Sequence, residues 1–206
     1  VLNGHVADMV LVAARTGGSA GETTGLTLFA VPRDAAGVSV STDRMVDSSL
    51  SSRLSFEGVS VDADAVVGEV DAGWAVLSRL LNAGRIGSAA ETLGVGSGAM
   101  AMTFDYLKQR KQFGKVIGEF QALQHRAAHL YAEMETARSA VLKAQQLLDA
   151  GADNAELMVS VAKAKAGLAS NLAVREGVQM HGGIGMTDEY DIGLYMKRDR
   201  ALAEFM

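Results

Sequence analysis

The sequence predicts an α+β fold, in which a partial antiparallel β domain precedes an up-and-down four-helix bundle (the last helix truncated). Two observations carry this prediction. Short apolar runs alternate with glycine- and serine-rich turns before residue 70, and apolar residues recur three and four positions apart after residue 73. The expected domains are therefore residues 1–70 and 71–206. Hydrophobic residues make up 49% of the 206 positions, which is enough for a sizeable core.

Composition excludes several classes of function. The net charge is −5 and the charges are well mixed, so we expect no nucleic-acid partner. The chain has no cysteine, which excludes disulfides and thiolate metal sites and fits a cytoplasmic protein. No uninterrupted run of about 18 apolar residues occurs, so we expect no membrane span.

The predicted β domain consists of short strands punctuated by turns. Apolar or alternating runs indicate strands at 9–14, 26–31, 38–41 and 54–56, and the chain's single proline, Pro32, closes the second. Turn clusters occupy 16–19, 34–37 and 47–49. This pattern is typical of an antiparallel sheet or part of a barrel.

Helical periodicity begins at Trp74 and continues to Leu107. A second helix has an unbroken apolar seam: Phe120, Leu123, Ala127, Leu130, Met134, Ala137, Val141, Ala144 and Leu148. Gly151 suits its C-terminal stop. A third helix from about Asn154 is expected to turn five residues inward: Leu157, Val161, Ala164, Leu168 and Leu172. A loop at 181–185 ends it, and Thr187 or Asp188 is the expected cap of a fourth helix.

Two patterns resemble ligand sites but favour structural roles. The glycines of 94–98 follow no strand, so they are expected to allow close packing of helices or close approach of a ligand. His125, His129 and Glu133 have a spacing that can chelate a metal, but they lie off the seam of their helix. A solvated or interface face is the favoured interpretation, and no metal site is expected.

The segment Arg110-Lys111-Gln112-Phe113-Gly114 allows two interpretations. A basic helix end followed by glycine matches the helix dipole and a C-terminal stop, and spacing alone favours this structural role. Alternatively, the Arg110 guanidinium pairs with a phosphate while Phe113 offers a flat face to a base.

The segment Gln179-Met180-His181-Gly182-Gly183-Ile184-Gly185 is a second candidate. Its glycines allow a backbone to approach a ligand with no Cβ in the way. A flexible turn between helices is the alternative, and it is slightly favoured.

Together these segments resemble a known family. Arg110–Gly118, followed by Phe120 and Gln121, resembles the Arg-x-x-Phe-Gly…Gln motif of acyl-CoA dehydrogenases, and 178–185 is similar to that family's second FAD motif. Asp71-Ala72-Gly73-Trp74 resembles its junction into the helical bundle, and 3–15 resembles a strand of its middle domain. The resemblance covers essentially the whole chain.

The resemblance implies FAD as cofactor. Arg110 would clamp the pyrophosphate of a neighbouring subunit's FAD, and Phe113 would line its adenine side. Gln121, Gln179, Gly182 and Gly183 would bind the same dinucleotide end. Subunits of the family form homodimers or homotetramers, and some form heterotetramers with a related subunit.

The resemblance also implies a reaction, the α,β-dehydrogenation of an acyl-CoA thioester to a trans-2-enoyl-CoA, with electrons passed to an electron-transfer flavoprotein. Arg85 matches an arginine at the thioester end of the substrate cleft. The family's catalytic glutamate aligns either with Gly84, which cannot act as a base, or just past Met206. The catalytic residue is therefore unknown from these residues.

Residues 181–189 are most similar to a small-subunit branch of the family, such as the small subunit of pimeloyl-CoA dehydrogenase. This favours a second hypothesis, a non-catalytic scaffold subunit that completes a partner's FAD site. Glutamate at position 207 would favour the enzyme, whereas glycine or alanine would favour the scaffold. An acyl-CoA oxidase shares many of these motifs, and a plain helical interaction module is the remaining alternative.

Overall fold

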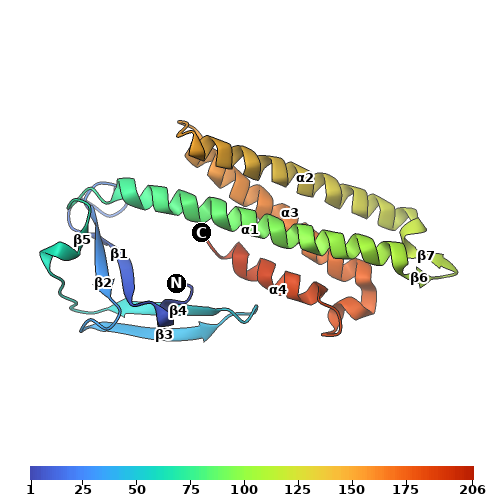
Figure 1. Cartoon of the computed structure of the whole chain (residues 1–206), viewed down its shortest axis with the longest axis horizontal. Coiled ribbons are helices and arrows are strands. Elements are labelled where there is room, and N and C mark those ends of the chain that lie inside the picture. The colour runs from blue at the N-terminus through green and yellow to red at the C-terminus, as the bar shows by residue number, and fades with distance from the viewer. The chain divides into compact units, whose positions relative to one another are not determined.

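The computed structural model describes all 206 residues and divides into two compact units, Val1–Leu81 and Asn82–Met206. The first unit is mostly β structure and the second is helical (Figure 1). The division falls two turns inside the first long helix, α1 (Trp74–Gln109). The predicted α+β class is confirmed, because antiparallel strands precede four helices.

The β unit contains two separate antiparallel sheets. Strand β2 (Leu26–Pro32) is central in the first sheet, between β1 (Met9–Arg15) and the short β5 (Val66–Val67). Strands β3 (Val38–Arg44) and β4 (Leu50–Phe56) form a hairpin of their own. Side chains of β1 alternate between exposed and half-buried, whereas β2 carries the fully buried Leu28. This is the alternation expected of strands with one buried face.

The β3–β4 hairpin is longer than its sequence pattern indicates. The apolar alternation ends near Ser41, yet the pairing continues to Arg44 opposite Leu50. Polar residues extend the hairpin because the cross-strand ladder satisfies their backbone groups whatever their side chains are.

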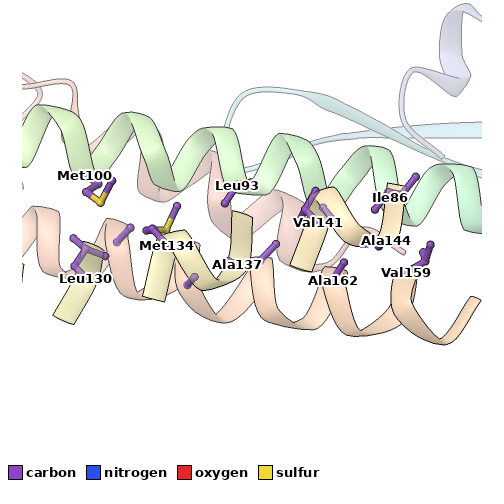
Figure 2. Close-up of a cluster of buried hydrophobic side chains, with 14 of the residues drawn as sticks. Ile86, Leu93, Met100, Leu130, Met134, Ala137, Val141, Ala144, Val159 and Ala162 are labelled. Atoms are coloured by element: carbon purple, nitrogen blue, oxygen red, sulfur yellow. The ribbon is translucent and has the colours of Figure 1, made fainter. Parts of the chain in front are cut away.

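The helical unit is a bundle of α1, α2 (Gln121–Asp149), α3 (Ala155–His181) and α4 (Ile192–Ala203). Figure 2 shows the core, in which side chains of α1, α2 and α3 meet. The predicted seam of α2 is confirmed: its five central positions are buried, and its flanking apolar residues pack against the same cluster. Gly151 has a φ of 62° just beyond the end of α2, so the predicted glycine stop is also confirmed.

The predicted inward face of α3 is wrong. Of the five residues expected inside, only Leu172 packs against the core, while Leu157, Val161 and Leu168 are 65%, 43% and 71% exposed. A different stripe, here called the alanine face, is buried instead: Ala155, Val159, Ala162, Ala166, Ala169 and Ala173. We call Leu157, Val161, Ala164 and Leu168 the leucine face. Small side chains are inside because they let α3 lie close to its neighbours.

The two apolar faces explain the composition of α3. Together with the turn that follows it (Ala155–Met186), α3 is long and apolar enough to cross a membrane by length and composition alone. Its alanine face lies in the bundle core, however, which is the ordinary reason for such a composition in a packed helix.

The fourth helix begins later than predicted. Thr187 does not cap it, because the Thr187 hydroxyl donates to the carbonyl of Ile184 in the preceding 3₁₀ turn (Gly182–Met186). Helix α4 begins at Ile192 after Asp191, which makes no side-chain cap, and it ends at Ala203 rather than continuing through Met206. The local hydroxyl bond therefore ties residue 187 to the turn before it.

The glycines of 94–98 lie inside α1, and the close packing expected of them is confirmed at two positions. A Cβ on Gly96 would lie 2.9 Å from the Cα of Ser170 on α3, and one on Gly98 would lie 2.6 Å from the Tyr195 ring on α4. Gly94 faces open space. Gly96 and Gly98 therefore set how closely α1 approaches α3 and α4.

Candidate functional site

Arg110 lies at the base of a small hairpin that follows α1. Strands β6 (Lys111–Gln112) and β7 (Lys115–Val116) pair antiparallel. The backbone of Arg110 is held twice: its N–H donates to the Tyr106 carbonyl at 2.9 Å, and its carbonyl accepts from Ile117 N–H at 2.9 Å. Its side chain is exposed and makes no hydrogen bond or ion pair within the chain. A guanidinium on a fixed backbone, with all five donors free, is suited to an anion.

Phe113 is at the tip of this hairpin. Phe113 and Gly114 have φ of 53° and 80°, as a two-residue type I′ turn requires. Positive φ is uncommon for a bulky side chain, and the Phe113 ring at this turn is 91% exposed. The Phe120 ring lies edge-on at 6.2 Å, and the Lys115 ammonium lies over Phe120 at 4.3 Å. A strained backbone that displays an exposed aromatic ring indicates a binding role.

Gln121 is the first residue of α2, and Phe120 separates it from the 3₁₀ turn Ile117–Glu119. Its side chain is exposed, and no side chain caps the helix at Phe120. The hairpin and the start of α2 therefore present a guanidinium, an aromatic ring and an amide on one short segment.

The second candidate segment ends α3. Gln179 is exposed on the last turn, and Gly182 follows the helix with φ 67° and ψ −142°, a conformation that favours glycine. A Cβ on Gly182 or Gly183 would meet nothing within 4 Å, so the backbone there is open to solvent. The expected open glycine turn is present.

His181 anchors that turn from within. Its ring is 3% exposed and lies between Tyr106 and Tyr190, with ring centroids 4.3 and 4.7 Å away. Its Nδ1 lies 2.7 Å from the Gly177 carbonyl, whereas Nε2 is buried without a partner. Burial lowers the pKa of His181, and the bond to Gly177 opposes this only partly. His181 is therefore a neutral, packed side chain that anchors the glycine turn.

The two candidate segments lie at the same end of the bundle (Figure 1). Tyr106, one turn before Arg110, stacks on His181 and donates its hydroxyl to the His181 carbonyl at 3.3 Å. The end of α1 and the glycine turn, some 70 residues apart in the sequence, are thus connected by direct side-chain contact.

A pocket of about 370 Å³ opens beside the glycine turn. It is lined by Arg175, Val178, Gln179, Gly182, Gly183, Met186 and Met196. The volume is within the range of small-molecule sites. Arg175 and Met196, two residues of this lining, are not among the site residues expected from the sequence. The spacing of Arg175 four residues before Gln179 was a signal for the first, whereas nothing in the sequence links α4 to this loop.

Arg85 lies elsewhere. It follows Gly84 near the start of the helical unit, and 25 positions on a helix separate it from Arg110 by roughly 37 Å. Its Nη1 is 3.5 Å from Asn82 Oδ1. A Cβ on Gly84 would lie 2.5 Å from the Cε of Met206. The structure therefore brings together Gly84 and Met206, the neighbourhoods of the two alternative positions for a catalytic glutamate.

Polar groups of α3 and α4 fix the end of α4, which leads to Met206. Asp199 is 3% exposed and lies 3.4 Å from Asn171 Nδ2. The Lys163 ammonium donates to the Leu202 carbonyl at 3.2 Å, on the last turn of the helix. Burial lowers the pKa of Lys163, while the nearby Asp199 carboxylate opposes the shift. A cation at a helix C-terminus stabilises that end.

The His125, His129 and Glu133 group makes ordinary surface contacts. Glu133 pairs with Lys165 of α3 at 2.6 Å, which lowers the pKa of the Glu133 carboxyl, and His129 Nε2 lies 4.0 Å from Glu133. His125 and His129 are exposed. The pair with Lys165 ties α2 to α3, as an interhelical ion pair does.

The residues of both segments fit a dinucleotide. A free guanidinium suits a pyrophosphate, an exposed ring suits a base, and amides and open glycine backbone suit the polar edges between them. These groups match those that the sequence resemblance implies for binding FAD.

Comparisons with known proteins show the family of this chain. Residues 71–205 match the family model described as acyl-CoA dehydrogenase, C-terminal domain. The short/branched chain specific acyl-CoA dehydrogenase of Bos taurus is 34% identical over 200 residues, which cover 96% of this chain and 46% of that protein. The caffeyl-CoA reductase-Etf complex subunit CarC of Acetobacterium woodii is 34% identical and covers 90% of this chain and 49% of its own.

A solved structure shows the same architecture. One chain of the ChsE4-ChsE5 complex of Mycobacterium tuberculosis superposes with a TM-score of 0.83 at 28% identity, over 97% of this chain and 51% of that chain. The chain spans about half the length of the curated relatives it matches.

Proposed function

Because this chain belongs to the acyl-CoA dehydrogenase family, we propose that it is the C-terminal half of a FAD-dependent enzyme that converts an acyl-CoA thioester to a trans-2-enoyl-CoA. The observation that carries the proposal is the pair of segments at one bundle end. One presents an unpaired Arg110 and an exposed Phe113 on the same hairpin. The other presents an open glycine turn after His181, whose carbonyl accepts from Tyr106 near the end of α1.

The chain's own residues have defined roles in this proposal. Arg110 binds the pyrophosphate of a neighbouring subunit's FAD with a forked pair of donors, and Phe113 covers the adenine side of that FAD. Gln121 and Gln179 donate amide hydrogen bonds, and the backbone of Gly182 and Gly183 makes close contacts. When bound, FAD supplies the hydride acceptor for the β carbon of the substrate. The bundle's contribution is to hold and orient the dinucleotide end.

Arg85 contributes at the other end of α1, in this proposal. Its guanidinium borders the thioester, where negative charge develops as the α proton leaves. The carboxylate that removes this proton belongs to the neighbourhood of Gly84 and Met206, which are in contact. Proton removal is most effective from a carboxylate whose pKa is raised in a site without water.

We propose an electron-transfer flavoprotein as the redox partner. The Acetobacterium woodii relative is, by its name, a subunit of a complex with such a protein. We also propose that the bundle associates with a second copy through the leucine face of α3. Three large aliphatic residues at helical spacing are left in solvent there, and identical copies present the same period to each other.

The test is an anaerobic titration of the full-length protein, expressed without a partner, with a panel of acyl-CoAs while the flavin absorbance is followed. Bleaching by one thioester is the expected result and identifies the substrate class. Protein that purifies without flavin, although correctly folded, contradicts the proposal.

A second function has one observation in its favour. The Mycobacterium tuberculosis structure of similar fold is a complex of two different chains. This chain would then be a scaffold subunit that completes the FAD site of a related partner. Flavin that is retained but not bleached by any thioester, together with bleaching after coexpression with the partner, would favour this function over the first.

A further inference from the structure

We propose that Arg175 is a further phosphate-binding residue, which binds the adenosine diphosphate half of the dinucleotide in the pocket beside the glycine turn. This inference rests on the proposed function and extends its site. None of the six cofactor-binding residues expected from the sequence is Arg175, and the pocket adds apolar walls that those residues do not supply.

The helix register places Arg175 in the pocket. Arg175, Gln179 and Gly182 lie four and then three positions apart along the end of α3, so they share one face. Val178 between them is half-buried and packs into the small second core with Ile192. The face that carries Arg175 and Gln179 is therefore fixed by packing, and both side chains line the same pocket.

The charge of Arg175 is uncompensated within the chain. The neighbouring carboxylate, Glu176, is engaged by Arg126 of α2 at 2.5 Å. Arg175 itself is exposed and makes no hydrogen bond or ion pair in the described structure. The nearby Lys197 is directed to Asp188, with 4.0 Å between their charged atoms. The guanidinium is thus the free cation of this pocket, and its planar fork matches a diphosphate.

The other walls suit a flat base. Met186 and Met196 are 79% and 39% exposed, and both line the pocket. Thioether side chains are polarisable and pack against aromatic rings. Gly182 and Gly183 leave the pocket open at the glycine turn, since no atom lies within 4 Å of where their Cβ atoms would be. A cation, an amide and two methionines around 370 Å³ form a site for an adenosine diphosphate rather than for a simple anion.

Adenosine diphosphate chemistry has two sources here, FAD and the 3′-phospho-ADP of coenzyme A. We assign the pocket to FAD because Gln179, Gly182 and Gly183, which the proposed function gives to FAD, line it. The experiment separates the two sources by measuring FAD affinity and acyl-CoA affinity independently.

The test uses the full-length protein with three substitutions: Arg175→Gln, Arg175→Lys and, as a matched control, Arg44→Gln, which removes an exposed arginine from β3. FAD is removed and added back, and its Kd is measured from flavin fluorescence. Arg175→Gln is expected to weaken FAD binding by about tenfold or more, the effect of losing one charge-assisted hydrogen bond. Arg175→Lys is expected to be intermediate, since it keeps the charge but not the fork.

ADP should compete for the wild-type apoprotein and compete less well for Arg175→Gln. Unchanged FAD affinity in Arg175→Gln overturns the inference while leaving the proposed function intact, provided that the wild type binds FAD. Unchanged FAD affinity with weaker acyl-CoA binding also overturns it and assigns Arg175 to coenzyme A. A wild-type protein that binds no FAD would contradict the proposed function itself.

Discussion

At the scale of single residues, Arg110 and His181 use backbone and side chain for different tasks: one part fixes the residue in the fold, and the other leaves a group exposed. Arg110 is held through its backbone, by Tyr106 and Ile117, and its guanidinium is left free. Phe113 has a positive φ that its side chain disfavours, and the ring is exposed rather than buried. His181 is the reverse case, because its side chain is packed inside so that the two glycines after it can be open.

The first prediction concerns the free guanidinium. Arg110→Ala in the full-length protein should weaken FAD retention by about tenfold or more, because a charge-assisted pair to the pyrophosphate is lost. The protein-bound flavin is measured after desalting. Since Arg110 has no partner within the chain, the melting temperature of the apoprotein should not change. Full flavin content in this variant would remove Arg110 from the site.

Phe113 should show a trade between stability and binding. Phe113→Gly relieves a positive φ that costs a bulky residue about 1 kcal/mol, and it removes almost no buried surface. The apoprotein should therefore be as stable as the wild type or slightly more stable, while FAD binds more weakly. Chemical unfolding of the apoprotein and a flavin titration measure the two effects. A clear loss of apoprotein stability would mean that the ring has a structural role instead.

His181 should make stability depend on pH. Its pKa is lowered in the folded state by burial, so the neutral ring is favoured by folding. That stability is fully present above the unfolded pKa of about 6.5 and is lost as the pH falls below it. His181→Phe keeps an aromatic ring between Tyr106 and Tyr190 but cannot be protonated.

The measurement is the melting temperature at pH 7.5 and pH 5.5. The wild type should lose more stability between these values than His181→Phe does. Equal losses in the two proteins would show that other groups account for the acid sensitivity.

At the scale of elements, helix contacts are set by small residues. Alanines of α3 and two glycines of α1 form the close contacts, and the larger leucines of α3 are in solvent. The Lys165–Glu133 pair and the Lys163 contact to the end of α4 fix the same helix on two sides. Helix α3 is therefore the element against which the others are placed.

Two glycines of α1 provide a matched test of this arrangement. Gly96→Ala places a methyl 2.9 Å from the Ser170 Cα, so it should destabilise the protein by about 1–3 kcal/mol despite its better helix propensity. Gly94→Ala faces open space and should stabilise it by up to about 1 kcal/mol. Both are measured by chemical unfolding. Similar effects of the two substitutions would mean that α1 and α3 are not in close contact.

At the scale of the whole molecule, the packing of the helical unit leaves one apolar surface in solvent. This surface is the leucine face of α3, where the side chains of Leu157 and Leu168 are 65% and 71% exposed. Because exposed aliphatic residues in a row are typical of interfaces, we propose this face as the contact with a second copy. An assembly through this face would leave the FAD segments at the far end of α3 free to meet a neighbour.

The last prediction tests that interface. The double substitution Leu157→Ser and Leu168→Ser should reduce the mass of the full-length protein to a smaller oligomer, because it removes the apolar surface that a second copy would bury. Light scattering during size-exclusion chromatography measures the mass. Val46→Ser, at an exposed turn residue of the β unit, is the control. An unchanged mass would place the contact on another face, and dissociation only of a related subunit would favour the heteromer.

Local patterns in the sequence determined much of this protein. They predict the change from strands to helices, the seam of α2, the stop at Gly151 and both candidate FAD segments, because each of these features depends on neighbouring residues. Which face of α3 is buried was decided only by tertiary structure. Both its faces are apolar with the same period, and the alanines are inside because close helix approach leaves no room for leucines. The pocket lined by Arg175 and Met196 was likewise decided by tertiary structure, because it forms only where α4 packs against α3.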